Sequence, residues 1–408
     1  MSTFANVQAG STIYTQAFAL TKAFQDDKSD KKVNLSVGAY RTDDGKPWVL
    51  PVVRKAEIML ANDETLNKEY LPVLGLEDFT NASTGMLLGS ASKAIAEGKV
   101  ISTQTLSGTG ALRVAAEFLS RQMNFNTFYY SAQTWENHGL IFMNAGFTDG
   151  RTYRYWDSEK RCIDFEGFKE DLNNAPENAV IILHGCAHNP TGSDPTHEQW
   201  KELAQIIKSR KLFPLFDCAY QGFASGNLDN DAWSVRYFAD NGFELLCCQS
   251  YAKNFGLYNE RVGNLVIIVS DPSVIANIKS QLLLVIRAMY SNPPSHGARI
   301  VAKVLNSPQL YEEWKTCIST MAERIIKMRK QLRERLEALK TPGTWSHITT
   351  QIGMFSFTGL TPKQVEYVVN ECHVYMMGTG RISMCGINSS NIDHVAQSIH
   401  DAVVKIPN

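Results

Sequence analysis

The sequence contains no apolar run long enough to cross a membrane, although 44% of its 408 residues are hydrophobic. Its first residues lack the basic and apolar regions of a secretion signal, and they lack the arginine-rich character of an organelle-targeting peptide. We therefore expect a cytoplasmic protein. Internal repeats, low-complexity segments and flexible linkers are also missing, which favours a folded globular chain.

Excess charge of either sign is absent as well, because 40 basic and 41 acidic residues leave a net charge of -1. This balance gives no reason to expect a nucleic acid or an anionic membrane as a partner. An acidic substrate must then be recognised by individually placed arginines. The eight cysteines show no Cys-x-x-Cys spacing, so we expect reduced, mostly buried thiols with neither a metal site nor a disulfide framework.

Short apolar strands alternate with helical segments along most of the chain, a pattern typical of an α/β protein with a mostly parallel sheet. An alternating segment at 32–41 predicts a further strand near the N-terminus. From Leu310 to Leu339, apolar residues recur only at spacings of three and four. This periodicity predicts one long amphipathic helix that bridges two domains.

A single lysine, Lys253, lies between two apolar runs, 243–248 and 262–269, which predict buried strands. Because a lysine there is poorly solvated, its neutral amine is accessible, as capture of a carbonyl group requires. An ordinary loop lysine is the alternative. Ser250 and Arg261, however, flank Lys253 and are residue types that bind phosphate. A carbonyl-capturing lysine beside a phosphate site suggests pyridoxal phosphate.

A second phosphate signal lies at residues 107–110, Ser-Gly-Thr-Gly, between a strand at 101–106 and a helix over 114–119. A glycine-rich turn at the N-terminus of a helix binds anions through backbone N–H groups and the helix dipole. A dinucleotide site is a weak alternative, because Arg113 stands where that fingerprint requires glycine or alanine. The segment therefore favours a monophosphate.

An acidic residue, Asp217, ends another apolar strand, at the position where open α/β sheets place ligand contacts. A buried carboxylate is costly unless a cation pairs with it. A pyridinium nitrogen is such a cation, so Asp217 is predicted to hold the cofactor ring in its protonated, electron-accepting form.

Residues 250–263 read Ser-x-x-Lys-Asn-x-Gly-Leu-Tyr-x-Glu-Arg-x-Gly. This motif resembles the cofactor-lysine segment of class I pyridoxal-phosphate-dependent aspartate aminotransferases, and the resemblance extends over nearly the whole chain, most closely to the animal cytosolic members. It implies the type I fold of pyridoxal-phosphate-dependent transferases and a homodimer with shared active sites. The implied domains are an N-terminal arm with part of the small domain (1–45), a large cofactor-binding domain (46–319) and the small domain (320–408).

The resemblance also implies roles around the cofactor ring. Lys253 would bind pyridoxal phosphate covalently and then carry the substrate proton. Asp217 would pair with the ring nitrogen, Tyr220 and Asn189 would bond the phenolic oxygen, and Trp135 would stack on the ring. The residues implied for the phosphate are Ser107, Gly108, Thr109, Ser250, Arg261 and Tyr70 of the neighbouring subunit.

For the substrate, the resemblance implies a backbone contact from Gly38, contacts from Trp135 and Asn189, and two carboxylate-binding arginines. Arg381 would bind the α-carboxylate, and Arg287 of the neighbouring subunit would bind the side-chain carboxylate. On the residues alone, Gly38 could equally be a turn, Trp135 and Tyr70 packing residues, and Arg287 a solvated helix-terminal cation. One departure is Gln133, where the family usually has proline ahead of Trp135.

These features predict an L-aspartate:2-oxoglutarate aminotransferase that works by ping-pong transfer. Broad-specificity or aromatic aminotransferases remain an alternative, because such relatives can keep both arginines. A catalytically silent binding protein of the same fold is the alternative from another class. The complete set Asn189, Asp217, Tyr220, Lys253, Arg261 and Arg381 argues against it, since a silent protein has no need of them all.

Overall fold

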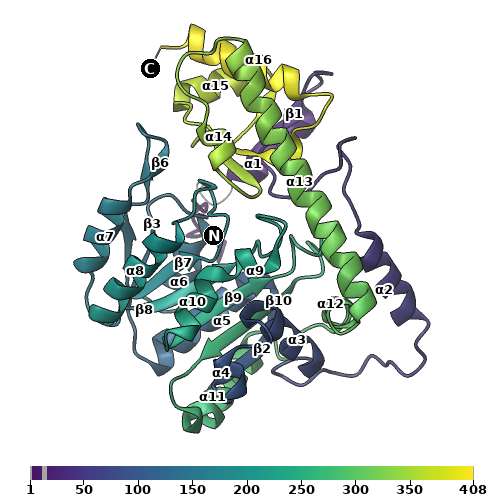
Figure 1. Ribbon diagram of the computed structural model, residues 1–408, viewed down its shortest axis with the longest axis vertical. Coiled ribbons are helices and arrows are strands. Elements are labelled where there is room, and N and C mark those ends of the chain that lie inside the picture. The colour runs from purple at the N-terminus through teal and green to yellow at the C-terminus, as the bar shows by residue number, and fades with distance from the viewer. Residues whose placement is uncertain (1, 12–15, 408) are drawn as a thin grey trace.

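A seven-stranded sheet lies at the centre of the large lower part of the protein, whose computed structural model describes residues 2–11 and 16–407 (Figure 1). All neighbouring strands are parallel except β10, which is antiparallel to both of its neighbours. The predicted mostly parallel sheet is therefore confirmed. In spatial order the strands are β2 (Val100–Leu106), β10 (Val262–Ile268), β9 (Leu245–Ser250), β8 (Phe213–Cys218), β7 (Val180–His184), β3 (Thr127–Ser131) and β4 (Asp149–Tyr153).

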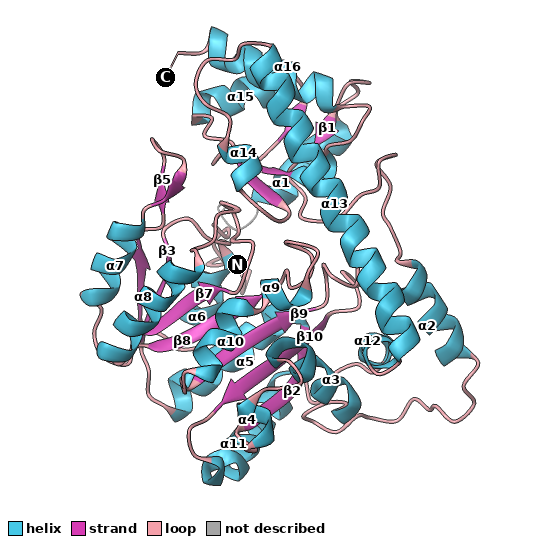
Figure 2. Ribbon diagram, in the orientation of Figure 1, coloured by secondary structure: helices cyan, strands magenta, loops and turns pink. Residues whose placement is uncertain are grey.

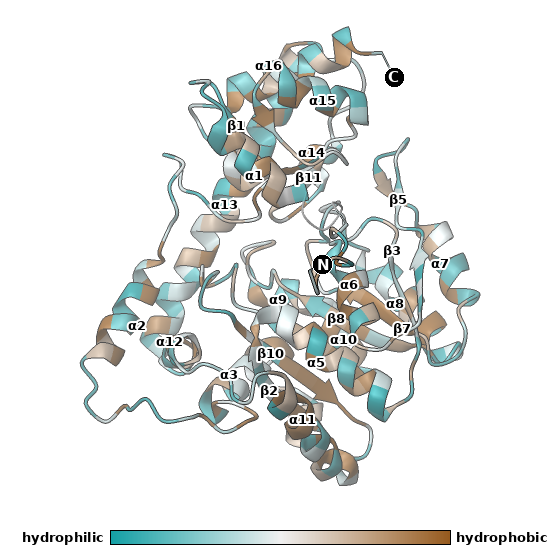
Figure 3. Ribbon diagram, turned by 180° about the vertical axis from the view of Figure 1, so that it is seen from behind, coloured by the Kyte–Doolittle hydropathy of each residue, from teal (hydrophilic) through white to brown (hydrophobic). Residues whose placement is uncertain are grey.

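Helices cover both faces of this sheet, which explains why its central strands are apolar at nearly every position (Figures 2 and 3). In β7, Val180 and Ile182 pack with one set of helices, while Ile181 and Leu183 pack with the other. The first set is α5 (Ser107–Gln122), α6 (Asn137–Asn144) and α11 (Ile275–Met289). The second set is α7 (Phe165–Asn173), α8 (His197–Ser209) and α10 (Trp233–Asp240).

The long helix α13 (Pro308–Ala338) confirms the element predicted from the spacing of apolar residues after Leu310. It begins at Ser307, whose side chain accepts a hydrogen bond from the Leu310 N–H, and it buries one face that includes Trp314. In Figure 1 it runs from the side of the sheet to a second group of elements at the top. That group contains α14 (His347–Thr350), α15 (Pro362–Asn370), α16 (Ile392–Lys405), β11 (Phe355–Phe357), β12 (Val374–Tyr375) and β13 (Arg381–Ser383).

The strand predicted over 32–41 is wrong in length, because only β1 (Val33–Asn34) forms, in parallel pairing with β12. The Leu35 carbonyl still accepts a hydrogen bond from the Ser383 N–H of β13 at 2.7 Å, but the carbonyls of Ser36 and Gly38 bond to side chains of the site. Arg381 Nη2 donates to the Ser36 carbonyl at 2.9 Å, and Lys253 Nζ donates to the Gly38 carbonyl at 2.7 Å. The segment thus leaves the sheet to cover the site.

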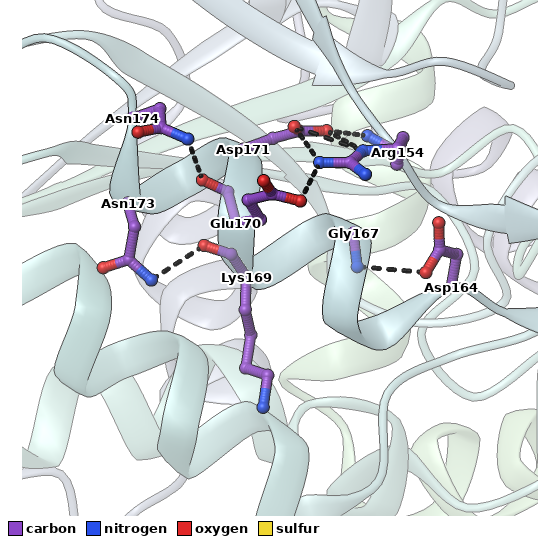
Figure 4. Close-up of polar contacts among 8 residues, drawn as sticks. All are labelled: Arg154, Asp164, Gly167, Lys169, Glu170, Asp171, Asn173 and Asn174. Atoms are coloured by element: carbon purple, nitrogen blue, oxygen red, sulfur yellow. Dashed lines mark hydrogen bonds and ion pairs between the residues drawn. The ribbon is translucent and has the colours of Figure 1, made fainter.

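Polar contacts fasten the loop that follows β4 to helix α7 (Figure 4). Arg154 forms ion pairs with Asp171 at 2.7 Å and Glu170 at 2.6 Å. Asp164 caps the helix by accepting a hydrogen bond from the Gly167 N–H at 3.0 Å. The remaining elements are α1 (Gln16–Asp26), α2 (Pro51–Ala61), α3 (Glu77–Leu88), α4 (Lys93–Ala96), α9 (Leu228–Asp231), α12 (His296–Leu305), β5 (Trp156–Asp157), β6 (Cys162–Ile163) and the 3₁₀ turns η2 (Pro272–Val274) and η3 (Met384–Gly386).

The eight cysteines all carry free thiols, and six of them are buried, as their positions in apolar runs indicate. Within residues 2–11 and 16–407, no helix is both long and apolar enough to span a bilayer.

Candidate active site

Several loops meet at one edge of the sheet, because β2, β7, β8 and β9 end there and β10 begins there. The register places His184 beside Asp217, and Ser250 beside Gly263. A cavity of about 390 Å³ opens above this edge. Of the residues predicted from the sequence, those that line it are Gly38, Ser107, Gly108, Thr109, Trp135, Asn189, Asp217, Tyr220, Ser250, Lys253, Arg261 and Arg381.

One end of the cavity is suited to bind an anion. Helix α5 begins there at Ser107, and its capping residue, Leu106, supplies no side-chain hydrogen bond to the first N–H groups. Arg261 Nη2 donates to Ser107 Oγ at 2.5 Å, and the Ser107 N–H donates to the Arg261 carbonyl at 3.0 Å. A Cβ atom on Gly108 would lie 3.0 Å from Ser250 Cβ, so glycine lets these two segments approach closely. Backbone donors, two hydroxyls and a guanidinium therefore converge as a phosphate group requires.

Lys253 lies in the same cavity, three residues after β9 ends. Its Nζ donates to the Gly38 carbonyl at 2.7 Å and lies 4.8 Å from the centre of the Tyr258 ring. Burial is the main cause that lowers the pKa of Lys253 to about 8, and the positive charges of Arg261 and Arg381 act in the same direction. The accessible neutral amine predicted from the sequence follows from this environment.

Asp217, the last residue but one of β8, lines the cavity and accepts a hydrogen bond from His138 Nε2 at 2.9 Å. Burial acts to raise the pKa of Asp217, but the bond from His138 and the neighbouring charges hold that pKa below its ordinary value. The carboxylate therefore stays ionised, although this environment is largely closed to water.

A chain of hydrogen bonds determines which nitrogen of His138 carries the proton. The Asn189 N–H can only donate, so His184 Nδ1 accepts it at 3.3 Å and His184 Nε2 must carry a proton. That nitrogen donates to Thr134 Oγ1 at 3.1 Å, and the hydroxyl donates to His138 Nδ1 at 2.9 Å. His138 is then left with its proton on Nε2, directed at Asp217. Burial also lowers the pKa of His184 well below its usual value, which keeps the His184 ring neutral.

Opposite the anion-binding end, Arg381 is 7% exposed and is held on three sides. It donates to the Ser36 carbonyl at 2.9 Å and to Asn189 Oδ1 at 3.4 Å, and its guanidinium lies 4.2 Å from the Phe355 ring centre. Its Nε is buried and has no hydrogen-bond partner among the described residues. Burial lowers the pKa of Arg381. An unpaired guanidinium in a cavity is a natural site for a carboxylate.

The sequence pattern of the family described as class I and II aminotransferases matches residues 30–399. The chain belongs to this family.

Individual aminotransferases match over nearly their full length. The cytoplasmic aspartate aminotransferase of Gallus gallus is 58% identical over 394 residues, which cover 95% of this chain and 96% of that protein. The cytoplasmic aspartate aminotransferase structure from Saccharomyces cerevisiae has 43% identity, a TM-score of 0.96 and 99% coverage of both chains. The structure of an aromatic-amino-acid aminotransferase of Burkholderia pseudomallei, covalently bound to pyridoxal phosphate, has 39% identity and a TM-score of 0.95. The match covers 99% of this chain and 100% of that chain. The expected type I aminotransferase fold is thus confirmed.

Two residues predicted for the site of this aminotransferase do not line its cavity. Tyr70 is 86% exposed. Arg287 is exposed near the end of α11, where its Nη1 donates to Ser291 Oγ. Their predicted roles therefore depend on a second subunit.

Trp135 lines the cavity even though Gln133 replaces the usual proline of the family. The Trp135 ring packs edge-on against His138, with ring centres 5.5 Å apart and an interplanar angle of 86°. The Gln133 Oε1 is buried without a partner among the described residues. The substitution thus leaves an unsatisfied acceptor beside the site, while the indole still lines the cavity.

Sequence reasoning missed four residues of this aminotransferase site: His138 and His184, which support Asp217, and Ser36 and Phe355, which hold Arg381. His184 could have been predicted, because it is a polar residue at the carboxyl end of an apolar strand, as Asp217 is. The other three are distant in sequence from the residues they contact, and no local pattern pairs them.

Proposed function

We propose that this protein is a cytoplasmic L-aspartate:2-oxoglutarate aminotransferase that uses pyridoxal phosphate and yields oxaloacetate and L-glutamate. The names of its relatives support the reaction and the location, and the pyridoxal phosphate carried by the Burkholderia pseudomallei relative supports the cofactor. The observation that carries the proposal is the cavity itself. It places a lysine of lowered pKa among a phosphate-type cradle, a buried carboxylate and an arginine whose Nε has no hydrogen-bond partner among the described residues.

The donor set of the cavity fits pyridoxal phosphate. When bound, this group supplies a carbonyl that combines with an amine and a protonated ring that withdraws electrons from the substrate. Asp217 would hold the proton at the ring nitrogen, because the hydrogen bond from His138 helps to keep its carboxylate charged. Trp135 would stack on the ring face. Tyr220, whose pKa burial raises, would stay protonated and donate with Asn189 to the phenolic oxygen.

Lys253 has two tasks. Its neutral amine would hold the cofactor through the carbonyl carbon. When the substrate amine takes its place, Lys253 Nζ would be free to move a proton to and from the substrate α-carbon. A pKa of about 8 suits both steps, since Lys253 can take up and release a proton near neutral pH.

Recognition of a dicarboxylic substrate requires a cation for each carboxylate. Among the described residues that line the cavity, the cationic side chains are Lys253, Arg261 and Arg381. Lys253 is committed to the amine chemistry and Arg261 to the phosphate, so Arg381 binds the α-carboxylate and nothing remains for the second carboxylate. Arg287 of the partner subunit supplies that charge, and Tyr70 of the partner subunit reaches the phosphate. The active enzyme is therefore a homodimer.

The division into domains is part of the same proposal. Residues 46–319 form the large cofactor-binding domain, and 320–408 join the N-terminal 1–45 in the small domain. The pairing of β1 with β12 supports the joining of the two chain ends. The boundary falls within the unbroken helix α13, so the two domains share that helix.

The visible spectrum of the purified protein tests the function. Bound pyridoxal phosphate should give a pH-dependent absorption band that bleaches on addition of L-aspartate and returns with 2-oxoglutarate. An absorption band that neither compound changes would favour a catalytically silent binding protein. A band that bleaches with phenylalanine but not with aspartate would favour an aromatic aminotransferase, the alternative supported by the likeness to the Burkholderia pseudomallei enzyme.

A further inference from the structure

Helix α13 carries a buried arginine that lies outside the cavity. Arg329 is 2% exposed, and no carboxylate of the described residues lies within ion-pair distance of it. Its Nη1 donates to the Ile348 carbonyl at 2.9 Å. Its Nη2 donates to the carbonyls of Gly353, at 2.9 Å, and Phe355. The cation thus binds three backbone oxygens of one short segment, 348–355.

The segment held by Arg329 ends at the cavity. It runs from α14, which packs on α13, into β11 (Figure 3). Its last residue, Phe355, lines the cavity, with its ring centre 4.2 Å from the Arg381 guanidinium. A Cβ atom on Gly38 would lie 3.0 Å from the tip of that ring, so the ring is also in close contact with the segment that covers Lys253.

A buried cation is an expensive way to hold a loop. Burial lowers the pKa of Arg329 to about 9, and its Nε has no partner among the described residues. An apolar side chain of similar length would fill the same space without that cost. What an apolar side chain could not do is fix the positions of three carbonyls at once, which the planar guanidinium does.

We propose that Arg329 is a positioning residue for carboxylate recognition: by fixing segment 348–355 it holds the Phe355 ring against Arg381 and so orients the guanidinium that binds the α-carboxylate. The inference rests on the proposed function of Arg381. Every amino acid and oxo acid substrate has an α-carboxylate. Loss of Arg329 therefore weakens all substrates equally, whereas loss of Arg287 weakens only those with a second carboxylate.

The test compares Arg329→Lys with wild type as the pyridoxal-phosphate-loaded enzyme. Lysine keeps the charge but lacks the planar fork, so it cannot serve three carbonyls together. We expect KM to rise about tenfold for aspartate, 2-oxoglutarate and phenylalanine alike, while kcat changes less than about threefold. The dissociation constant of succinate, measured through its effect on the cofactor spectrum, should rise by the same factor. Cofactor content should not change, since the phosphate cradle lies on other segments.

Arg333→Lys is the matched control. Arg333 lies one turn further along α13, bonds Thr349 Oγ1 at 2.9 Å from the exposed side and pairs with Glu337. Its replacement should leave every KM unchanged. If Arg329→Lys fails to fold, Phe355→Leu decides, because it removes the ring but keeps Arg329, and it should give the same uniform rise in KM.

An unchanged KM in a folded Arg329→Lys or Phe355→Leu enzyme would overturn the inference, as would a loss confined to kcat or to the yield of folded protein. A rise for aspartate without a rise for phenylalanine would also contradict it. Wild-type enzyme that transaminates phenylalanine but not aspartate would overturn the proposed substrate instead. In that case, the KM for phenylalanine of Arg329→Lys, compared with that of wild type, would still test the role of Arg329.

Discussion

Asp217 and Lys253 need opposite charge states in the same cavity, the first ionised and the second neutral. Asp217 must stay charged while buried, and the hydrogen bond from His138 helps to hold the pKa of Asp217 below its ordinary value. Lys253 must lose its charge readily, and burial beside two arginines achieves that. Two titratable groups driven in the directions that their tasks require are a strong sign of an active site.

Asp217→Asn tests the first of these arrangements. The amide cannot hold a proton on the ring nitrogen, so withdrawal of electrons from the substrate should fail while the phosphate cradle remains intact. We expect the half-reaction with aspartate, followed by stopped-flow absorbance, to slow by at least about 100-fold. Cofactor occupancy should fall much less. A half-reaction as fast as that of wild type would show that Asp217 is misassigned.

The lowered pKa of Lys253 predicts a pH dependence. A lysine with a pKa of about 8 is mostly protonated below that pH and mostly neutral above it, and only the neutral amine attacks a carbonyl. The rate at which cofactor-free protein captures pyridoxal phosphate should rise with pH up to about 8 and then level off. An ordinary lysine would give a rate that climbs to about pH 10. Rapid-mixing absorbance between pH 6 and 10 distinguishes the two curves.

At the level of elements, the cradle depends on how closely β10 approaches the start of α5. A Cβ atom on Gly263 would lie 2.3 Å from the carbonyl carbon of Ser107. Gly263→Ala must therefore displace Ser107 and the N–H groups that follow it. We expect the dissociation constant of pyridoxal phosphate to rise at least about tenfold, the effect of losing one charge-assisted hydrogen bond.

Gly85→Ala provides the control for that variant. Gly85 lies in α3, and a Cβ atom there meets nothing within 4 Å. Alanine favours helix by up to about 1 kcal/mol over glycine, so this variant should bind the cofactor normally and unfold at the same temperature or higher. Equal cofactor affinity in the two variants would contradict the account of the cradle.

The elements also show where sequence reasoning succeeds. Asp217 and Lys253 could be placed because apolar strands end beside them and parallel strands end at one edge. The strand predicted at 32–41 failed because alternation reports only which face is buried. It does not reveal that Ser36 and Gly38 give their carbonyls to side chains. His138 was missed for a related reason, since its partner lies 79 residues away.

For the whole molecule, the exposure of Tyr70 and Arg287 matters most, because both were assigned to a site that they do not reach within one chain. The proposed homodimer would bring both residues of one subunit to the site of the other. Loss of Arg287 should leave the second carboxylate of aspartate unpaired. At roughly 1.5–3 kcal/mol for each charge-assisted hydrogen bond, Arg287→Ala should lower kcat/KM for aspartate about 10- to 100-fold. Alanine and aromatic substrates should be little affected.

Subunit exchange tests the sharing of sites directly. Lys253→Ala should bind pyridoxal phosphate without turning over, and Arg287→Ala should be poorly active with aspartate. In a mixed dimer, one site combines an intact Lys253 with the intact Arg287 of the partner subunit. Activity towards aspartate should reappear after exchange. If mixed dimers form and no activity returns, the assignment of Arg287 to the neighbouring site is wrong.

Selection of a dicarboxylic substrate by two arginines is measured most directly as kcat/KM of the wild-type enzyme for L-aspartate and L-phenylalanine with 2-oxoglutarate as acceptor. Two charge-assisted hydrogen bonds to the second carboxylate amount to at least about 3 kcal/mol, so aspartate should be preferred roughly 100-fold or more. Equal values, or a preference for phenylalanine, would contradict the account.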